Sequence, residues 1–539
     1  MMKNYSQIST ILYRVVKVLF FAIFLFVTEL LFFAHPWLNY VVKKTFLLPN
    51  VVLLPLTLLL FYGVYRLSLV LRRKNWKIWG MNPDHVVLVG SVVLLFVQLF
   101  ISYHIYFATG WDAGGYVLPT ARMIASGESV ASMNFYFARY PNNILMVWLF
   151  SLIMRLKDII PWLARFNDLS LIIVLNCLIS SLTGFLTYKA VKKLLGSSWA
   201  VFSWGIYVLL VGLSPWFVIT YSDSLALFLP VLIFLVYTQE WHEKWAALKW
   251  LLIGLLSFLG YYIRPQTLIM LIAILIIEGW KMLFDSGKEK RKFLIKLGAV
   301  ILAFLLAKGA NQAVLGRTGL IMNEDEVFGW SHFAMMGLNE DRDGVYSDED
   351  VQFSQSFKTK EERQAANLEE IKARLKEMGP GRYLLFLARK TLVNYGDGTF
   401  AWGVEGNFFW EIFENEDPHI SPWLRSYFYT DGENYGITST VQNGLWVTLI
   451  FSMLGLVFLD PKKIDSNIYV LMLALIGLTL FETIFESRAR YLFIYAPIYI
   501  TLGTMGLKML WAKFPKLHKS GEGQLPGTSD KDVSEGKEK

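Results

Sequence analysis

An aspartate, Asp112, follows a long apolar segment in the stretch GWDAGGYVLPTARMIASGE, Gly110 to Glu128. Ionisable side chains at a membrane border are costly to desolvate and often have a function. A carboxylate placed there can act as a general base and take the proton of a reacting hydroxyl. The alternative is an ordinary solvated loop carboxylate, and its position alone does not separate the two.

Other apolar segments also carry polar side chains at their ends, in the stretches NFYFARYPNN, TYSDSLALF, YYIRPQ and ESRARY. The candidate anion-binding residues are Arg139, Arg264, Arg488 and Arg490, and the candidate substrate-binding residues are Tyr116, Tyr136, Tyr140, Asn142, Asn143, Tyr221, Asp223 and Glu486. An arginine can donate two parallel hydrogen bonds to a phosphate, so we predict a role in binding an anion. A single arginine at a membrane border can instead contact lipid phosphates.

The elements that must position these residues are long apolar segments. The chain has 539 residues, of which 55% are hydrophobic and only 17% are charged, whereas soluble domains carry about 25% charged residues. Apolar stretches of about 20 residues are typical of membrane-crossing helices. We therefore predict an all-α polytopic membrane protein with about 13 spans, near residues 11–34, 50–71, 85–107, 142–155, 168–190, 198–215, 220–238, 248–263, 266–280, 292–310, 441–459, 467–485 and 490–511. The single cysteine, Cys177, excludes an intrachain disulfide and a cysteine-based metal site.

The order of apolar and polar stretches predicts five parts. These are two extra N-terminal spans in 1–84, a membrane core in 85–311 with the outer loop 108–141, an acidic insert in 312–440, the last spans in 441–511, and a disordered tail in 512–539. The tail is rich in Gly, Ser, Glu and Lys, a composition typical of disorder. Within the insert, residues 358–381 predict a polar helix that ends at Gly379–Pro380.

The distribution of charge predicts which face these residues share. The formal net charge is +8, but the insert holds 22 Asp and Glu against 12 Lys and Arg, which gives the insert −10 and leaves the remainder near +18. The basic excess lies in short connections such as residues 288–292, and basic short loops stay on the cytoplasmic side. This places residues 108–141 and 312–440 outside. The preference of basic loops for the cytoplasmic side also accounts for the positive net charge, so we expect no nucleic-acid partner. Thirteen crossings would put two basic termini on opposite sides, so the side of the C-terminus stays open.

Four motifs follow one another along residues 85–511. Asp112 precedes the pair Tyr140–Pro141, KAVKKLLG ends a helix, a Tyr-Ser-Asp stretch opens a span at Tyr221, and RYLFIYAPIY begins at Arg490. In this order they resemble the GT-C superfamily of membrane glycosyltransferases, near the protein O-mannosyltransferase and aminoarabinose-transferase branch (glycosyltransferase family 39). The chain departs from that family in its two extra N-terminal spans, its single outer-loop aspartate, and Asn142–Asn143 after the proline instead of a proline pair.

The resemblance implies a GT-C-like bundle with an extracytoplasmic loop domain, in the plasma membrane of a bacterium. It implies a sugar donor linked to a polyprenyl lipid through phosphate, and an acceptor hydroxyl on an envelope glycan, glycolipid or protein. Asp112 in the catalytic outer loop would be the general base, and the four arginines named above would bind the donor phosphate. Direct displacement would invert the anomeric centre. No cofactor is assigned, and a divalent metal is left open without assigned ligands.

Two other classes of protein stay open. A transporter or flippase of lipid-linked saccharides would carry ionisable or helix-breaking residues near the middle of the bilayer. Here the conspicuous charges lie at the ends of the apolar segments, which favours the transferase. The protein could also be a non-catalytic scaffold of the cell envelope. Only the order of the four motifs argues against that class.

Overall fold

The computed structural model of the chain is helical along most of its length. It describes residues 2–35, 37–41, 45–73, 82–283, 287–402, 409–413, 417–460 and 465–513. The predicted disordered tail therefore lies almost wholly outside the described residues. Lys74, Lys77, Lys462 and Lys463, which belong to short basic connections between predicted spans, also lie outside them.

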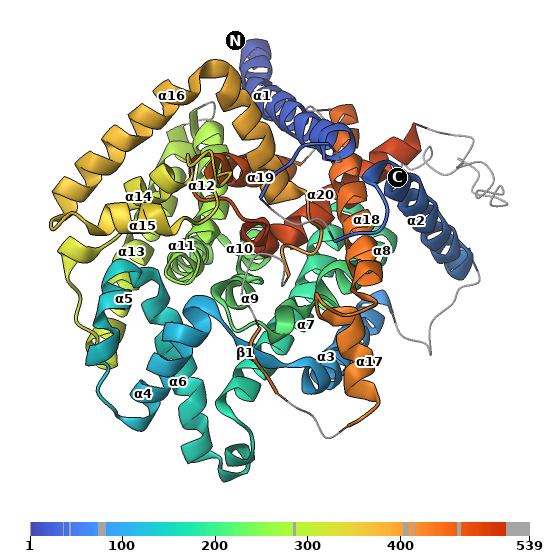
Figure 1. Cartoon of the computed structure of the whole chain (residues 1–539). Coiled ribbons are helices and arrows are strands. Elements are labelled where there is room, and N and C mark those ends of the chain that lie inside the picture. The colour runs from blue at the N-terminus through green and yellow to red at the C-terminus, as the bar shows by residue number, and fades with distance from the viewer. Residues whose placement is uncertain are drawn as a thin grey trace, which may run out of the picture.

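Twenty α-helices and two short strands follow one another in the described residues. In chain order they are α1 (Met2–Glu29), α2 (Asn50–Arg73), α3 (Pro83–Ile105), β1 (Phe107–Thr109), α4 (Leu118–Ser126), α5 (Asn134–Arg139), α6 (Ile144–Ile159), α7 (Asp168–Leu195), α8 (Ser197–Tyr207), α9 (Ser222–Ala226), α10 (Leu229–Thr238), α11 (Ala246–Tyr261), α12 (Leu268–Leu283), α13 (Gly287–Thr318), α14 (Trp330–Met336), α15 (Asp348–Gln355), α16 (Lys360–Tyr395), β2 (Phe409–Ile412), α17 (Ile420–Phe428), α18 (Tyr435–Met453), α19 (Asn467–Ile484) and α20 (Ala496–Ala512). Figure 1 shows their arrangement, with α20 inside the bundle and α16 along its edge.

Eight helices of the described residues are long and apolar enough to cross a membrane. They are Ile11–Ala34, Pro83–Ile105, Asp168–Leu195, Pro265–Leu283, Lys290–Thr318, Tyr435–Phe458, Asn467–Ile484 and Ala489–Ala512. Each coincides with a predicted span, in agreement with the prediction of an all-α polytopic membrane protein.

The other five predicted spans fall on α2 and on four shorter helical stretches. The span 50–71 falls on α2, which has 24 residues, and its part Asn50–Arg66 is apolar. Ser197–Gly212 and Ser222–Thr238 are apolar and 10–17 residues long, while 142–155 and 248–263 fall on α6 and α11, of 16 residues each. A helix of that length is about 24 Å long, which is less than the roughly 30 Å of a hydrocarbon core. The count of 13 crossings therefore stays a prediction.

α20 lies deep in the bundle because its neighbours approach it at small residues. All its residues from Ala496 to Leu507 are buried. A Cβ atom added to Gly506 would collide with the backbone of Ser452 in α18, and one added to Gly503 would press on Leu449. Close approach at small residues is a main source of helix association in lipid. The packing of α20 also fixes the short 3₁₀ helix Ala489–Tyr495 that leads into it.

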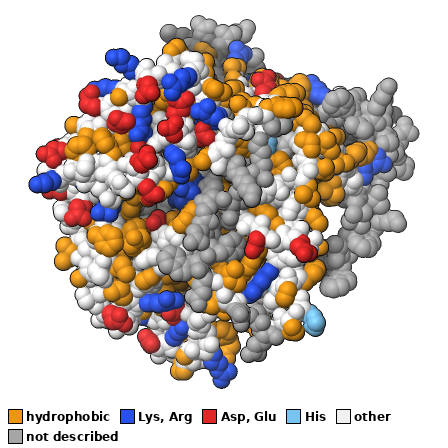
Figure 2. All heavy atoms as spheres, in the orientation of Figure 1, with side chains coloured by type: hydrophobic (Ala, Val, Ile, Leu, Met, Phe, Trp, Pro, Cys, Tyr) orange, Lys and Arg blue, Asp and Glu red, His pale blue; other side chains and the backbone are white. Residues whose placement is uncertain are grey.

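The acidic insert lies against the bundle through α14, α15 and α16. Charged side chains gather on the surface over α15 and α16, at the upper left of Figure 2. The polar helix predicted to end at Gly379–Pro380 does end there, because Gly379 has a non-helical backbone (φ 58°, ψ 178°) that separates the two helical segments of α16. The segment after the break contains the buried residues Phe386 and Leu392.

A two-stranded sheet joins the insert to the outer loop. β1 pairs antiparallel with β2, with Phe107 opposite Ile412 and Thr109 opposite Phe409. Because Asp112 follows β1 closely, this pairing fixes the start of the segment that carries the candidate base.

Candidate functional site

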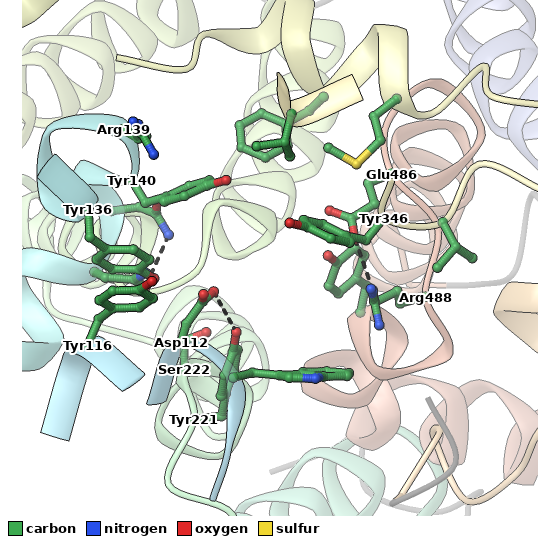
Figure 3. Close-up of a pocket in the computed structure, with 18 of the residues that line it drawn as sticks. Asp112, Tyr116, Tyr136, Arg139, Tyr140, Tyr221, Ser222, Tyr346, Glu486 and Arg488 are labelled. Atoms are coloured by element: carbon green, nitrogen blue, oxygen red, sulfur yellow. Dashed lines mark hydrogen bonds and ion pairs between the residues drawn. The ribbon is translucent and has the colours of Figure 1, made fainter. Parts of the chain in front are cut away.

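A cavity of about 1010 Å³ lies where the outer loop, several helix ends and the insert meet (Figure 3). The predicted site residues that line it are Asp112, Tyr116, Tyr136, Arg139, Tyr140, Asn142, Asn143, Tyr221, Arg264, Glu486, Arg488 and Arg490. Asp223 is the predicted site residue that does not line the cavity. The volume is at the upper end of the range for small-molecule sites.

Asp112 is half-buried in the cavity wall, directly before a π-helical turn, Ala113–Val117. The hydroxyl of Tyr221 donates a hydrogen bond to Asp112 Oδ2 at 2.9 Å, drawn in Figure 3. Burial raises the pKa of Asp112, although the Tyr221 hydrogen bond, the charge of Arg490 and a hydrogen bond from Tyr136 oppose the rise. A carboxylate with a raised pKa is a better proton acceptor than an ordinary aspartate.

The residue before Asp112 has an unusual backbone conformation. Trp111 adopts a φ of 55°, in the left-handed region that bulky residues rarely occupy. The guanidinium carbons of Arg488 and Arg490 lie 4.9 and 5.5 Å from the centre of its indole ring. Such strain persists only where the surroundings over-determine it, and it clusters at functional sites. Trp111 therefore connects the Asp112 segment to two arginines, and no pattern in the sequence singled it out.

Two of the arginines share one buried carboxylate. Arg264 Nη2 lies 3.0 Å from Asp223 Oδ1, and Arg490 Nη1 lies 3.4 Å from Asp223 Oδ2. The ring centre of Tyr491 is 4.3 Å from the guanidinium carbon of Arg264 and 5.0 Å from that of Arg490. Asp223 was predicted to bind substrate, but its side chain is fully buried and holds the two arginines from behind.

Arg488 has a carboxylate partner of its own. Its Nε lies 2.9 Å from Glu486 Oε1. Burial would raise the pKa of Glu486, but the charge and hydrogen bond of Arg488 and the charge of Arg490 outweigh it and hold that pKa below its usual range. Three arginines thus face two carboxylates, Asp223 and Glu486. We call Arg264, Arg488 and Arg490 the arginine wall.

The opposite side of the cavity is made of tyrosines and amides. The rings of Tyr116 and Tyr136 stack with centres 4.1 Å apart and planes 7° apart. Asn143 Nδ2 donates a hydrogen bond to the hydroxyl of Tyr136 at 2.7 Å. We call Tyr116, Tyr136, Tyr140, Asn142 and Asn143 the tyrosine wall. Flat rings beside amides offer apolar contact and hydrogen bonds to a polyhydroxyl ligand.

The insert supplies a third, apolar wall that the sequence did not predict. It is formed by Phe333 and Met336 of α14, Val345, and Val351 of α15. These residues lie in an acidic stretch without a spacing that marks a site, and they face the cavity only because the insert folds back over it.

A buried lysine fastens this third wall to the arginine wall. Lys390 of α16 is 1% exposed, and its ammonium donates to the carbonyl of Phe485 at 2.7 Å and to that of Gly337. The backbone N–H of Ser487 also donates to Gly344 O at 2.8 Å. The segment that carries Glu486 is therefore held by the insert. A lysine amid apolar residues in FLARKTLVNY was the available signal.

Among the described residues, no group of three or more His, Cys, Asp or Glu side chains is placed to hold a metal ion. The carboxylates that line the cavity are Asp112 and Glu486. The first accepts a tyrosine hydroxyl and the second pairs with an arginine, so both are engaged by neighbouring side chains.

Comparison with known proteins identifies a family to which the chain belongs. The family model described as "Conserved hypothetical integral membrane protein" matches residues 2–511. Neither the curated proteins nor the solved structures gave a match. The matched range includes every residue that lines the cavity. The chain therefore belongs to this family of integral membrane proteins.

Proposed function

We propose that the protein is a membrane glycosyltransferase of the GT-C type, which moves a sugar from a polyprenyl-phosphate-linked donor to an acceptor hydroxyl. The observation that carries the proposal is the position of Asp112 in one cavity with the arginine wall and the tyrosine wall. Transfer from a phosphate to a hydroxyl needs a proton acceptor for the hydroxyl and fixed positive charge for the phosphate. The cavity offers both.

The donor phosphate binds at the arginine wall. As the bond from the anomeric carbon to the phosphate oxygen breaks, negative charge grows on the leaving phosphate, and donors already in place stabilise it. Asp223 and Glu486 hold the arginines in position, so the wall needs little rearrangement when the donor binds. The apolar lipid tail extends into the bilayer, beside the membrane-crossing helices.

The acceptor hydroxyl binds between Asp112 and the tyrosine wall. Its oxygen attacks the anomeric carbon, the bond to phosphate breaks, and Asp112 takes the hydroxyl proton. Attack from the side opposite the leaving phosphate inverts the anomeric centre. The stacked rings of Tyr116 and Tyr136 pack against sugar rings, and Asn143 holds Tyr136 in place.

Sugar transfer from a radiolabelled polyprenyl-phosphate sugar in proteoliposomes tests the proposal. Asp112→Asn keeps the shape of the side chain but cannot take a proton, so we expect a rate loss of about 10²–10⁴-fold with donor binding retained. Asp158→Asn, at an exposed aspartate of α6, is the matched control and should keep full activity. Equal transfer by the two variants would remove Asp112 from the mechanism. Movement of the lipid-linked sugar across the bilayer without transfer would favour a flippase.

The proposal also puts the cavity on the extracytoplasmic face. Glu369 of α16 has a side chain that is 73% exposed, so Glu369→Cys in a Cys177→Ser background should react with an impermeant maleimide in intact cells. Lys290→Cys, at an exposed lysine in the basic first turn of α13, should react only after lysis. The reverse pattern would put the cavity on the cytoplasmic side.

A further inference from the structure

The helix α17, Ile420–Phe428, lies between the ends of two candidate membrane spans. It packs against α3 and precedes α18, which it also contacts (Figure 1). Both α3 and α18 belong to stretches that are long and apolar enough to cross a membrane. A helix placed between the end of one span and the start of the next lies at the level of the bilayer surface.

Side chains from α17 and from Tyr429, the residue after it, hold the end of α3 by hydrogen bonds. Arg425 Nε donates to the carbonyl of His104 at 3.1 Å, and the hydroxyl of Tyr429 donates to that of Ile105 at 2.8 Å. The hydroxyl of Ser421 lies 2.8 Å from His104 Nδ1. The last carbonyls of a helix have no partner within the helix, so these bonds satisfy the end of α3 and fix which face of α17 turns inward.

The face of α17 that turns outward is apolar and aromatic. Ile420 and Trp423 are 37% and 60% exposed, and the ring of Tyr427 lies 5.6 Å from that of Trp423. Ser421 and Leu424 on the inner face are buried. Residues three and four apart share one face of a helix. Tryptophan and tyrosine combine an apolar ring with a polar edge and are enriched at the headgroup level of membranes.

The span α3, against which α17 packs, also carries an exposed aromatic stripe. Phe96, Phe100 and Tyr103 are 65%, 52% and 61% exposed and recur at a spacing of four and three residues, on a helix that belongs to an integral membrane protein. The ring of His104, which is bonded to Ser421, lies 4.8 Å from that of Phe100 and 5.1 Å from that of Tyr103. The stripe therefore reaches α17 at Ser421, through the ring of His104.

We propose that α17 is an interfacial anchor, whose Ile420, Trp423 and Tyr427 lie at the boundary between headgroups and acyl chains. The partner is the lipid bilayer, in the leaflet from which α3 and α18 emerge. Amphipathic helices with Trp, Phe or Leu on one face bind membranes in this way.

The anchor has a consequence for the candidate base. β1 follows α3 directly and leads to Asp112, so anchoring the end of α3 holds Asp112 near the plane of the headgroups. The phosphate of a lipid-linked donor would lie at the same depth. This consequence rests on the proposed function, whereas the anchor itself does not.

Spin labels at three positions of similar exposure test the anchor. Trp423→Cys is compared with Phe96→Cys on α3 and with Glu369→Cys on α16, whose native side chain is 73% exposed. All three are made in the full-length chain with Cys177→Ser, in vesicles of phosphatidylethanolamine and phosphatidylglycerol. Power-saturation EPR measures the accessibility of each label to oxygen, which concentrates in lipid, and to a water-soluble nickel chelate.

We expect the ratio of oxygen to nickel accessibility to be highest at position 96, lowest at 369 and intermediate at 423, severalfold above that at 369. A ratio at 423 equal to that at 369 would show that α17 faces water and would overturn the anchor. If the Trp423 variant does not fold, Ile420→Cys on the same face replaces it, and the same two outcomes decide. Because these readouts do not involve sugar transfer, they stand apart from the test of Asp112.

Discussion

The arginine wall and the side of the cavity that carries the tyrosine wall and Arg139 differ in how their charges are held. In the arginine wall, Asp223 pairs with Arg264 and Arg490 from behind. On the other side, Arg139 has no ion-pair partner among the described residues, and its guanidinium carbon lies 5.8 Å from the ring centre of Phe135. Charges fixed in advance bind an anion with little loss of side-chain freedom, whereas an unpaired arginine can follow a ligand of variable shape.

This difference matches the two substrates of the proposed reaction. The phosphate of the donor is the same in every turnover and suits a fixed site. The acceptor offers hydroxyl groups in a less uniform arrangement and suits rings and amides. The fixed wall has a cost, because its stability depends on a carboxylate that is fully buried, and breaking a buried ion pair leaves an uncompensated charge.

The largest effect on folding is expected from the buried carboxylate. Asp223→Ala leaves Arg264 and Arg490 without their shared partner, and loss of one member of a buried ion pair costs about 3–5 kcal/mol. Asp168→Ala is the matched control, since that carboxylate pairs with Arg122 and Lys157 at the surface, where a pair contributes about 0–1 kcal/mol. Thermal unfolding in detergent measures both. Equal melting temperatures would mean that Asp223 does not support the wall.

Binding of polyprenyl phosphate should separate the two walls. Arg488→Ala removes a charge-assisted hydrogen bond of about 1.5–3 kcal/mol, which corresponds to a rise in Kd of roughly tenfold to a hundredfold. Arg488→Lys should restore only part of the affinity, because lysine lacks the planar fork. Arg139→Ala should change Kd much less. If both alanine variants bind equally weakly in a titration, the walls do not divide the work as proposed.

The pH dependence of transfer should reveal the raised pKa of Asp112. The base works only when deprotonated, so kcat/KM should fall as pH drops through a pKa above the ordinary aspartate value of about 3.9. Tyr221 donates the hydrogen bond that lowers this pKa. Tyr221→Phe should therefore move the acid limb of the profile to higher pH, while Tyr116→Phe should leave it in place. A shift to lower pH in the Tyr221 variant would contradict the assignment.

The smallest effect on donor binding is expected from Trp111, which connects the Asp112 segment to the arginine wall. Trp111 lies under Arg488 and Arg490, and a cation–π contact contributes about 0.5–1 kcal/mol at a partly exposed site. Trp111→Ala should raise KM for the donor by about 2- to 5-fold, with little change in kcat, and Trp111→Phe should recover most of the loss. An unchanged KM would show that the indole does not hold the arginines.

Much of the candidate site could be predicted because the bilayer constrains it. Asp112, Arg264 and Glu486 each lie at the end of an apolar segment, and a membrane brings the ends of its helices to a common plane. The predicted residues other than Asp223 line one cavity for that reason. Trp111 was missed because a left-handed backbone at a tryptophan has no signature in residue type.

The sequence by itself determined the long apolar spans, since runs of about 20 apolar residues have few other stable environments. Which helices lie side by side was decided by the tertiary structure, through shape at positions such as Gly506 against Ser452. That lateral order joins Asp223 to Arg490 across 267 positions of the chain. It leaves Asp112 facing the cavity while it buries Asp223 behind the arginines. Residue type and periodicity predict where the helices end. Burial depends on all the neighbours of a residue together, and it is burial that distinguishes Asp112, which faces the cavity, from Asp223, which does not.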